Sequence, residues 1–165
     1  NDTTTLRESQ VSSGGKPATG AALGLALAVG LIATWEGMST KPYADKLANN
    51  LMTVCYGETR VEMRPYTPEE CKQLLAKGVK DFAEPVMRCV PALRDRPYQL
   101  AASTSLAYNI GSNAFCRSTA ARRFNAGNWR GGCDAFLSWR YAGGREIRGL
   151  VNRRNAERNL CLKGL

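Results

Sequence analysis

Nineteen consecutive residues without a charge, from Pro17 to Trp35, limit what the N-terminal part of this chain can fold into. A run of this length is about what an α-helix needs to cross a bilayer. Nine of the nineteen residues are Ala or Gly, so the free energy of transfer into lipid is weak. Such a helix could enter a membrane and leave it again, or it could be a buried helix of a globular domain, because hydropathy alone does not separate the two. We therefore expect a polar tail over residues 1–15 and a weakly hydrophobic segment over residues 16–35.

Six cysteines and the absence of histidine restrict the chemistry. Successive cysteines are separated by fifteen or more residues, which argues against close-spaced zinc ligands. Three disulfides in an oxidising compartment would account for them, and six reduced buried thiols in a cytosolic protein are the alternative. Without histidine, Ser-His and Cys-His catalysis and His-ligated metal are excluded. We expect neither a metal nor another cofactor.

The net charge of +9 lies entirely in the second half of the chain. Residues 1–93 carry ten basic and ten acidic side chains, whereas residues 94–165 carry thirteen basic and four acidic ones. This asymmetry indicates an anionic partner, such as the cell wall or membrane phospholipid, or else a solvated basic face that keeps the protein soluble. Nucleic acid is not expected, because the sequence has no C-x-x-C, no recognition-helix motif and no aromatic RNA-binding signature.

Turn residues and hydrophobic periodicity predict a small β lobe followed by a larger helical lobe, with a cleft between them. Residues 43–66 favour an irregular sheet or hairpin. Thr67 and Glu70 have the spacing of a capping box, so a helix should begin there and run to Val79 or beyond. The remaining helices are expected at residues 98–110, 117–126, 130–140 and 150–161, and Pro85, Pro91 and Pro97 should bound short helical pieces. The fold class is α+β and predominantly helical.

Two carboxylates stand close together after the apolar segment. Glu36 follows Trp35, an environment that favours a neutral acid, and Asp45 lies in a polar turn. Hydrolysis of a glycosidic bond needs one protonated acid and a second carboxylate that stays ionised. On spacing alone the pair is a weak signal, because carboxylates nine positions apart are common on protein surfaces.

Five motifs, in order along the chain, resemble those of the phage lysozymes of glycoside hydrolase family 24. They are WEGMSTKPYAD, TVCYGET, YTPEECKQLL, AYNIGSNAFCRSTAARRFNAGNW and RGLVNRRNAERNLCL, and the similarity covers roughly residues 34–165. The resemblance implies a lysozyme-like catalytic domain over residues 36–165 and a muramidase that cleaves peptidoglycan between N-acetylmuramic acid and N-acetylglucosamine. It places the family's catalytic triad on Glu36, Asp45 and Thr53, with Glu36 as the acid and Thr53 holding the attacking water with Asp45.

The chain departs from the family pattern at two places. Seven residues separate Asp45 from Thr53, more than the family usually has. Glu58 stands where many members carry His; we expect it to be structural, although its carboxylate could lie near the cleft.

The resemblance also implies contacts outside the triad. Tyr108 and Asn109 lie where family members line the cleft, and Trp139, Arg140 and Tyr141 are further candidates for contact with sugar, with core packing or solvation as the alternative. The disulfide pairing that the resemblance favours is Cys55 with Cys71, Cys89 with Cys116, and Cys133 with Cys161.

The apolar segment directly before Glu36 resembles that of the signal-arrest-release (SAR) endolysins. This implies a monomeric enzyme of the host periplasm that is first tethered to the inner membrane through residues 16–35. Residues 1–54 contain no cysteine, so a thiol-exchange switch within them is excluded. We expect activation by release and refolding of the segment, which would bring Glu36 into register with Asp45.

Two other functions fit parts of the sequence. A lytic transglycosylase would use a single Glu and form an anhydro sugar, but Asp45 and Thr53 in their motif context argue against it. A cationic membrane-active protein without catalysis would need only the basic helices and the apolar segment.

Overall fold

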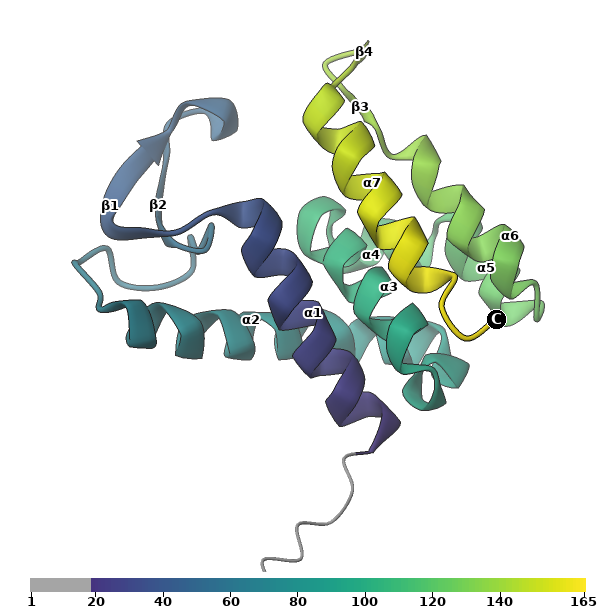
Figure 1. Cartoon of the computed structure of the whole chain (residues 1–165). Coiled ribbons are helices and arrows are strands. Elements are labelled where there is room, and N and C mark those ends of the chain that lie inside the picture. Colours follow the sequence, from purple (N-terminus) through teal and green to yellow (C-terminus); the bar gives the residue numbers. More distant parts are fainter. Residues whose placement is uncertain (1–18) are drawn as a thin grey trace, which may run out of the picture.

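The structure, a computed structural model, describes residues 19–165 (Figure 1). The tail predicted over residues 1–15, and residues 16–18 of the apolar segment, lie outside this range. The α-helices are α1 (Gly20–Glu36), α2 (Pro68–Cys89), α3 (Pro97–Ile110), α4 (Ser112–Cys116), α5 (Thr119–Asn125), α6 (Trp129–Asp134) and α7 (Arg148–Cys161). The strands are β1 (Ser39–Asp45), β2 (Leu51–Cys55), β3 (Tyr141–Ala142) and β4 (Arg145–Glu146), and the 3₁₀ turns are η1 (Lys46–Ala48), η2 (Pro91–Asp95) and η3 (Ala135–Ser138).

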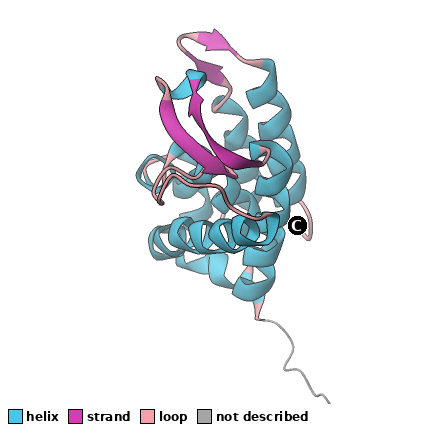
Figure 2. Cartoon of the chain, turned by 90° about the vertical axis from the view of Figure 1, so that its left-hand side faces the viewer, coloured by secondary structure: helices cyan, strands magenta, loops and turns pink. Residues whose placement is uncertain are grey.

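A hairpin and a helical body make up the molecule, as predicted. Strands β1 and β2 pair antiparallel and lie at one side of the helical body, with α1 leading into the hairpin and α2 running away from it (Figures 1 and 2). The helices α3 to α7 pack together on the other side of α1. Glu36 ends α1 at the point where the chain passes into the hairpin, which is the boundary where the cleft was predicted.

Helix α2 begins with the predicted capping box, in which the Thr67 hydroxyl accepts from the Glu70 N–H and the Glu70 carboxylate accepts from the Thr67 N–H. It does not stop near Pro85, so the expectation that Pro85 bounds a short piece is wrong. Ala83, Val86 and Met87 on both sides of the proline are buried in the core. This burial stabilises the helix more than the missing hydrogen bond at the proline destabilises it.

The C-terminal helices differ in their bounds from the predictions. The helix expected at 117–126 is shorter, and α4 precedes it. The helix expected at 130–140 ends at Asp134 and continues as a 3₁₀ turn, and the small β3–β4 hairpin follows it. The expected helix at 98–110 is confirmed as the central one, since residues 99–107 are all buried.

Helix α1 packs closely against α3 through a face that includes glycine and alanine. Gly24, Ala28 and Ile32 form its buried face, and a methyl group at Gly24 would lie 2.8 Å from Leu100 Cδ2. Residues 20–35 are thus integrated into the folded body in this state, which agrees with the buried-helix alternative. Within residues 19–165, no helix combines the length and the apolar character needed to cross a membrane.

Three disulfides link the described chain, with the pairing that the family resemblance implies. Cys55 bonds to Cys71, Cys89 to Cys116, and Cys133 to Cys161. The first joins the hairpin to α2, the second joins α2 to α4, and the third joins α6 to α7. Each closes a loop for which a stabilisation of about 3 to 4 kcal/mol is typical.

A buried group of charges joins α7 to α3. Glu157 is fully buried and forms ion pairs with Arg153 at 3.2 Å and with Arg154 at 2.7 Å. It also accepts a hydrogen bond of 2.6 Å from the Ser105 hydroxyl of α3. Burial is costly for each charge alone, so the group is stable only when all its partners are present.

The close approach of α1 to α3 predicts opposite effects for two glycines of the same helix. Gly24→Ala should lower the free energy of unfolding by about 1 to 3 kcal/mol, because its methyl group would overlap Leu100 and the Pro97 carbonyl. Gly30→Ala meets no atom within 4 Å and should be neutral or stabilising by about 0.5 to 1 kcal/mol. Urea unfolding of the two variants measures the difference, and equal stabilities would contradict this packing.

The buried charge group predicts a large effect of neutralising Glu157. Glu157→Gln should lower the free energy of unfolding by about 3 to 5 kcal/mol, because Arg154 is left buried without an anionic partner. The matched control is Glu146→Gln, whose ion pair with Arg140 is solvent-exposed and should leave the unfolding midpoint close to that of the wild type. Similar midpoints for the two variants would show that the buried group adds nothing.

Candidate active site

Glu36 lies between the helical body and the turn that follows β2. Its Oε1 accepts a hydrogen bond of 2.6 Å from Arg153 Nη1 of α7, and its side chain is 21% exposed. A Cβ placed on Gly57 would lie 3.1 Å from Glu36 Oε2, so this turn is the opposite wall. Oε2 makes no hydrogen bond with any residue of the described range. One carboxylate oxygen is held, and the other is open to a ligand.

Arg153 was not recognised in the sequence as a site residue. Its position in the final family motif and its i,i+4 spacing to Glu157 were visible, but its contact with a side chain 117 residues earlier was not. The surroundings of the Glu36 carboxylate are therefore not set by the apolar run alone, because the Arg153 side chain of α7 also contacts this carboxylate.

Asp45 is held by the turn that follows it. Its Oδ1 accepts from the Leu47 N–H at 2.9 Å, and its carbonyl oxygen accepts from the Asn50 N–H at 2.8 Å. Asn49 and Asn50 both take left-handed conformations, with φ of 53° and 60°. The residues after Asp45 thus form a compact turn, and the strands pair without a break from Asp45 and Leu51 to Tyr43 and Thr53.

The hairpin register brings Asp45 and Thr53 to the same face. Tyr43 pairs with Thr53 and Asp45 pairs with Leu51, so these four side chains share one face by the alternation of a strand. Thr53 is only 2% exposed, and its hydroxyl donates to the Leu51 carbonyl at 3.0 Å. Asp45 and Thr53 are therefore diagonal neighbours across the two strands.

Tyr43 lies near both carboxylates and was not among the predicted site residues. Burial raises its pKa, and the negative charges of Asp45 and Glu36 raise it further. Glu36 and the hairpin face that carries Asp45 are thus within electrostatic reach of one phenol. The signal in the sequence was its place two residues before Asp45, which puts the two side chains on the same face.

The predicted sugar contacts have protein partners in this structure. The Tyr108 hydroxyl donates to the Tyr56 carbonyl at 2.9 Å, and burial raises the pKa of this phenol. Asn109 is exposed and accepts from Arg154 at 2.8 Å. Tyr108 and Asn109 thus lie close to the turn and to the charges around Glu36.

The second group of candidates surrounds the β3–β4 hairpin. Trp139 packs against the core, and its carbonyl accepts from Arg154 at 3.5 Å. Arg140 pairs with Glu146 at 3.1 Å, and Tyr141 is 54% exposed. Of these side chains, Tyr141 is the most accessible.

Glu58 is buried and lies against α2. It is 8% exposed, and its Oε2 would be 3.5 Å from a Cβ on Gly78. Arg60 pairs with it at 3.1 Å, in keeping with the structural role expected for Glu58. Among residues 19–165, no group of His, Cys, Asp and Glu side chains is arranged to hold a metal ion.

Known proteins are similar to this chain over most of its length. The chain matches the family model described as Phage lysozyme over residues 33–157. It is 39% identical over 133 residues to the SAR-endolysin of Bacteriophage PS119, covering 78% of this chain and 77% of that protein. It is also 39% identical over 154 residues to the SAR-endolysin of Pseudomonas phage phiKMV, covering 90% of this chain and 92% of that protein.

A solved structure extends the comparison to the fold. The active form of the P1 phage endolysin Lyz superposes with a TM-score of 0.75 at 23% identity, covering 84% of each chain. The secreted inactive form of the same endolysin gives a TM-score of 0.52 at 22% identity, covering 64% of this chain and 75% of that one. The family match and the curated relatives each cover more than two thirds of the sequence. The chain therefore belongs to the phage lysozyme family and is a lytic enzyme.

Proposed function

We propose that the chain is a muramidase that hydrolyses the β-1,4 bond between N-acetylmuramic acid and N-acetylglucosamine in peptidoglycan. The observation that carries this proposal is the Glu36 carboxylate, which Arg153 holds by one oxygen at the boundary of the hairpin and the helical body. Asp45 supplies the second carboxylate from the neighbouring hairpin. Two carboxyl groups on either side of a glycosidic bond are the usual requirement for its hydrolysis.

In this mechanism Glu36 is the general acid. Its Oε2 carries the proton and gives it to the glycosidic oxygen as the bond between C1 and that oxygen breaks. Asp45 acts as the second carboxylate and stabilises the positive charge that develops on the sugar ring, and the Leu47 N–H fixes the position of its Oδ1. A water molecule, held by Asp45 and the Thr53 hydroxyl oxygen, adds its hydroxyl to C1 and releases a proton that restores the acid.

The catalytic proposal predicts that Glu36→Gln loses at least about 100-fold in turnover, because the amide cannot donate the proton. Asp45→Asn should lose activity similarly, whereas Glu62→Gln, an exposed carboxylate away from Glu36, should not. Turnover is followed on purified peptidoglycan, and the products are identified by mass spectrometry. Reducing N-acetylmuramic acid ends are expected.

Two other outcomes would each identify one of the alternative functions. Anhydro sugars would identify a lytic transglycosylase. Lysis by Glu36→Gln at the wild-type rate would identify a membrane-active protein without catalysis.

We further propose that the enzyme acts as a monomer in the host periplasm after an earlier stage at the inner membrane, tethered through residues 16–35. The names of the curated relatives support this, as does the greater similarity of this fold to the active form of the P1 endolysin than to its secreted inactive form. The apolar segment gives the physical reason. Its weak hydrophobicity makes the membrane only a marginal environment, and α3 offers its small-residue face a protein partner instead.

The release proposal predicts that Gly30→Leu keeps the protein in the membrane longer and delays lysis. The added side chain raises the free energy of transfer into lipid. In the folded enzyme it meets no atom within 4 Å of its Cβ, so the activity of the released protein should not change. Gly30→Ser is the control, since it alters the same site without adding apolar area.

The measurement separates the membrane fraction from the soluble periplasmic fraction over time. Equal release of the Leu and Ser variants would refute the proposal. Loss of activity in the purified Leu variant would show instead that this face of α1 is needed for catalysis.

A further inference from the structure

The turn after β2 holds an unusual backbone conformation. Val54 and Glu58 exchange two backbone hydrogen bonds of 2.9 Å, which close the turn over the residues between them. Inside it, Cys55 has a φ of +58° and Gly57 a φ of +74°. A left-handed conformation is uncommon for a residue other than glycine, so other contacts must stabilise the turn.

The Cys55–Cys71 disulfide bonds the turn to α2, and the Glu58 carboxylate holds the residues that follow it. Its Oε1 accepts from the Thr59 N–H at 3.0 Å, from the Arg60 N–H at 2.9 Å and from Arg60 Nε at 3.1 Å, and its Oε2 accepts from Arg60 Nη2 at 3.4 Å. Burial raises the pKa of Glu58, but the hydrogen bonds and charge of Arg60 outweigh burial and hold the pKa below its ordinary value. The carboxylate is therefore ionised at neutral pH, with donors from the turn around it.

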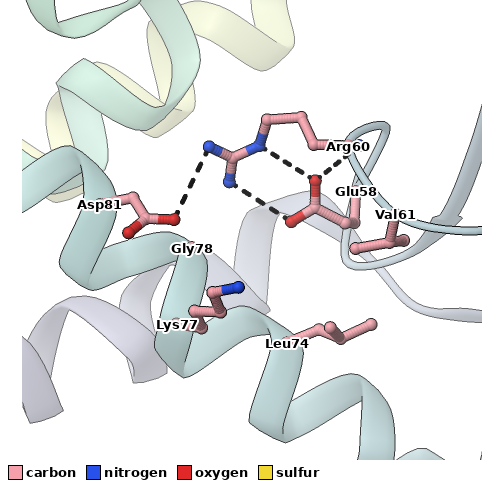
Figure 3. A pocket seen from close by; sticks show the side chains of 7 residues that line it. All are labelled: Glu58, Arg60, Val61, Leu74, Lys77, Gly78 and Asp81. Carbon is pink, nitrogen blue, oxygen red and sulfur yellow. Dashed lines mark hydrogen bonds and ion pairs between the residues drawn. The ribbon is translucent and has the colours of Figure 1, made fainter.

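Arg60 connects this carboxylate to α2. Its guanidinium lies 3.9 Å from Asp81 and 5.3 Å from the centre of the Phe82 ring. Figure 3 shows the guanidinium between the two carboxylates, beside Lys77 and Gly78 of α2. A small cavity of about 110 Å³ adjoins the pair, so water can reach this side of the turn. The turn is thereby attached to a long, stable helix.

The same turn forms a wall of the active site. Gly57 lies beside Glu36 Oε2, since a Cβ there would be only 3.1 Å from that oxygen. The preceding carbonyl, of Tyr56, accepts from Tyr108 at 2.9 Å. A shift of the turn would therefore change the space around the oxygen that donates the proton in the proposed mechanism.

We propose that Glu58 is a positioning residue for Glu36. Its ionised carboxylate keeps the turn over residues 54–60 closed and attached to α2, so that Gly57 stays against Glu36 Oε2 and confines the acid to one position. Glu58 does not touch the substrate in this role. The inference rests on the proposed function, because it concerns the position from which Glu36 Oε2 donates the proton in the proposed mechanism.

The test compares Glu58→Gln with Glu62→Gln on purified peptidoglycan. The glutamine has one acceptor oxygen in place of two and turns an NH₂ group toward the donors of Arg60, so the turn should loosen. We expect kcat to fall about tenfold with KM within about twofold, because misplacement of the acid affects the chemical step more than binding. Glu62 is exposed, its side chain being 81% accessible, and its variant should keep wild-type kinetics.

A second variant keeps the proposal testable if Glu58→Gln fails to fold. Arg60→Gln leaves Glu58 its two backbone donors and removes the guanidinium, with its bonds to Glu58 and its link to α2. It should lower kcat in the same direction by a smaller factor. Circular dichroism and the thermal midpoint are measured for every variant. A folded Glu58→Gln with wild-type kcat, or a loss of activity that matches only its unfolded fraction, would overturn the positioning role.

Wild type and Glu36→Gln are assayed alongside. Failure of the wild type to release reducing ends contradicts the proposed function. Wild-type kcat in folded Glu58→Gln, with Glu36→Gln inactive, contradicts the positioning role alone.

Discussion

The ion pair between Glu36 and Arg153 is the contact on which the arrangement of the site depends. It joins the last residue of α1 to α7, and through Arg153 it continues to Glu157 and to Ser105 of α3. Charges in a low-dielectric interior are stable only as a complete set. The geometry of Glu36 is therefore coupled to the packing of three helices, and disturbance of any of them reaches the carboxylate.

The small side chains of α1 affect both its packing on α3 and its affinity for lipid. Small residues on its buried face let it approach α3 closely, and the nine Ala and Gly residues between Pro17 and Trp35 add little free energy of transfer into lipid. A larger apolar side chain on the buried face would clash with Leu100, and one on the open face would add affinity for lipid. The composition of the segment is thus consistent with a helix that exchanges a lipid environment for a protein one.

The two local departures from the family pattern both lie beside the proposed carboxylates. The longer connection after Asp45 folds into a turn that donates an N–H to its side chain, and Glu58 closes the turn that carries Gly57. A backbone N–H of the first turn thus holds Asp45, whereas Glu36 is held by the Arg153 side chain and lies against the second turn at Gly57. In this chain both departures lie in short turns beside the site, and Tyr43 pairs with Thr53 in the hairpin.

Local sequence signals were sufficient for much of the fold, because capping and periodicity act within a few residues. The capping box at Thr67 and the buried helix around residues 98–110 are of this kind, and the family motifs supplied the disulfide pairing and the candidate acids. Tertiary packing alone decided that α2 continues through Pro85 and that Arg153 reaches Glu36 across 117 residues. Such contacts depend on how elements that are distant in the sequence pack together in space. Periodicity and spacing along the chain do not predict this packing.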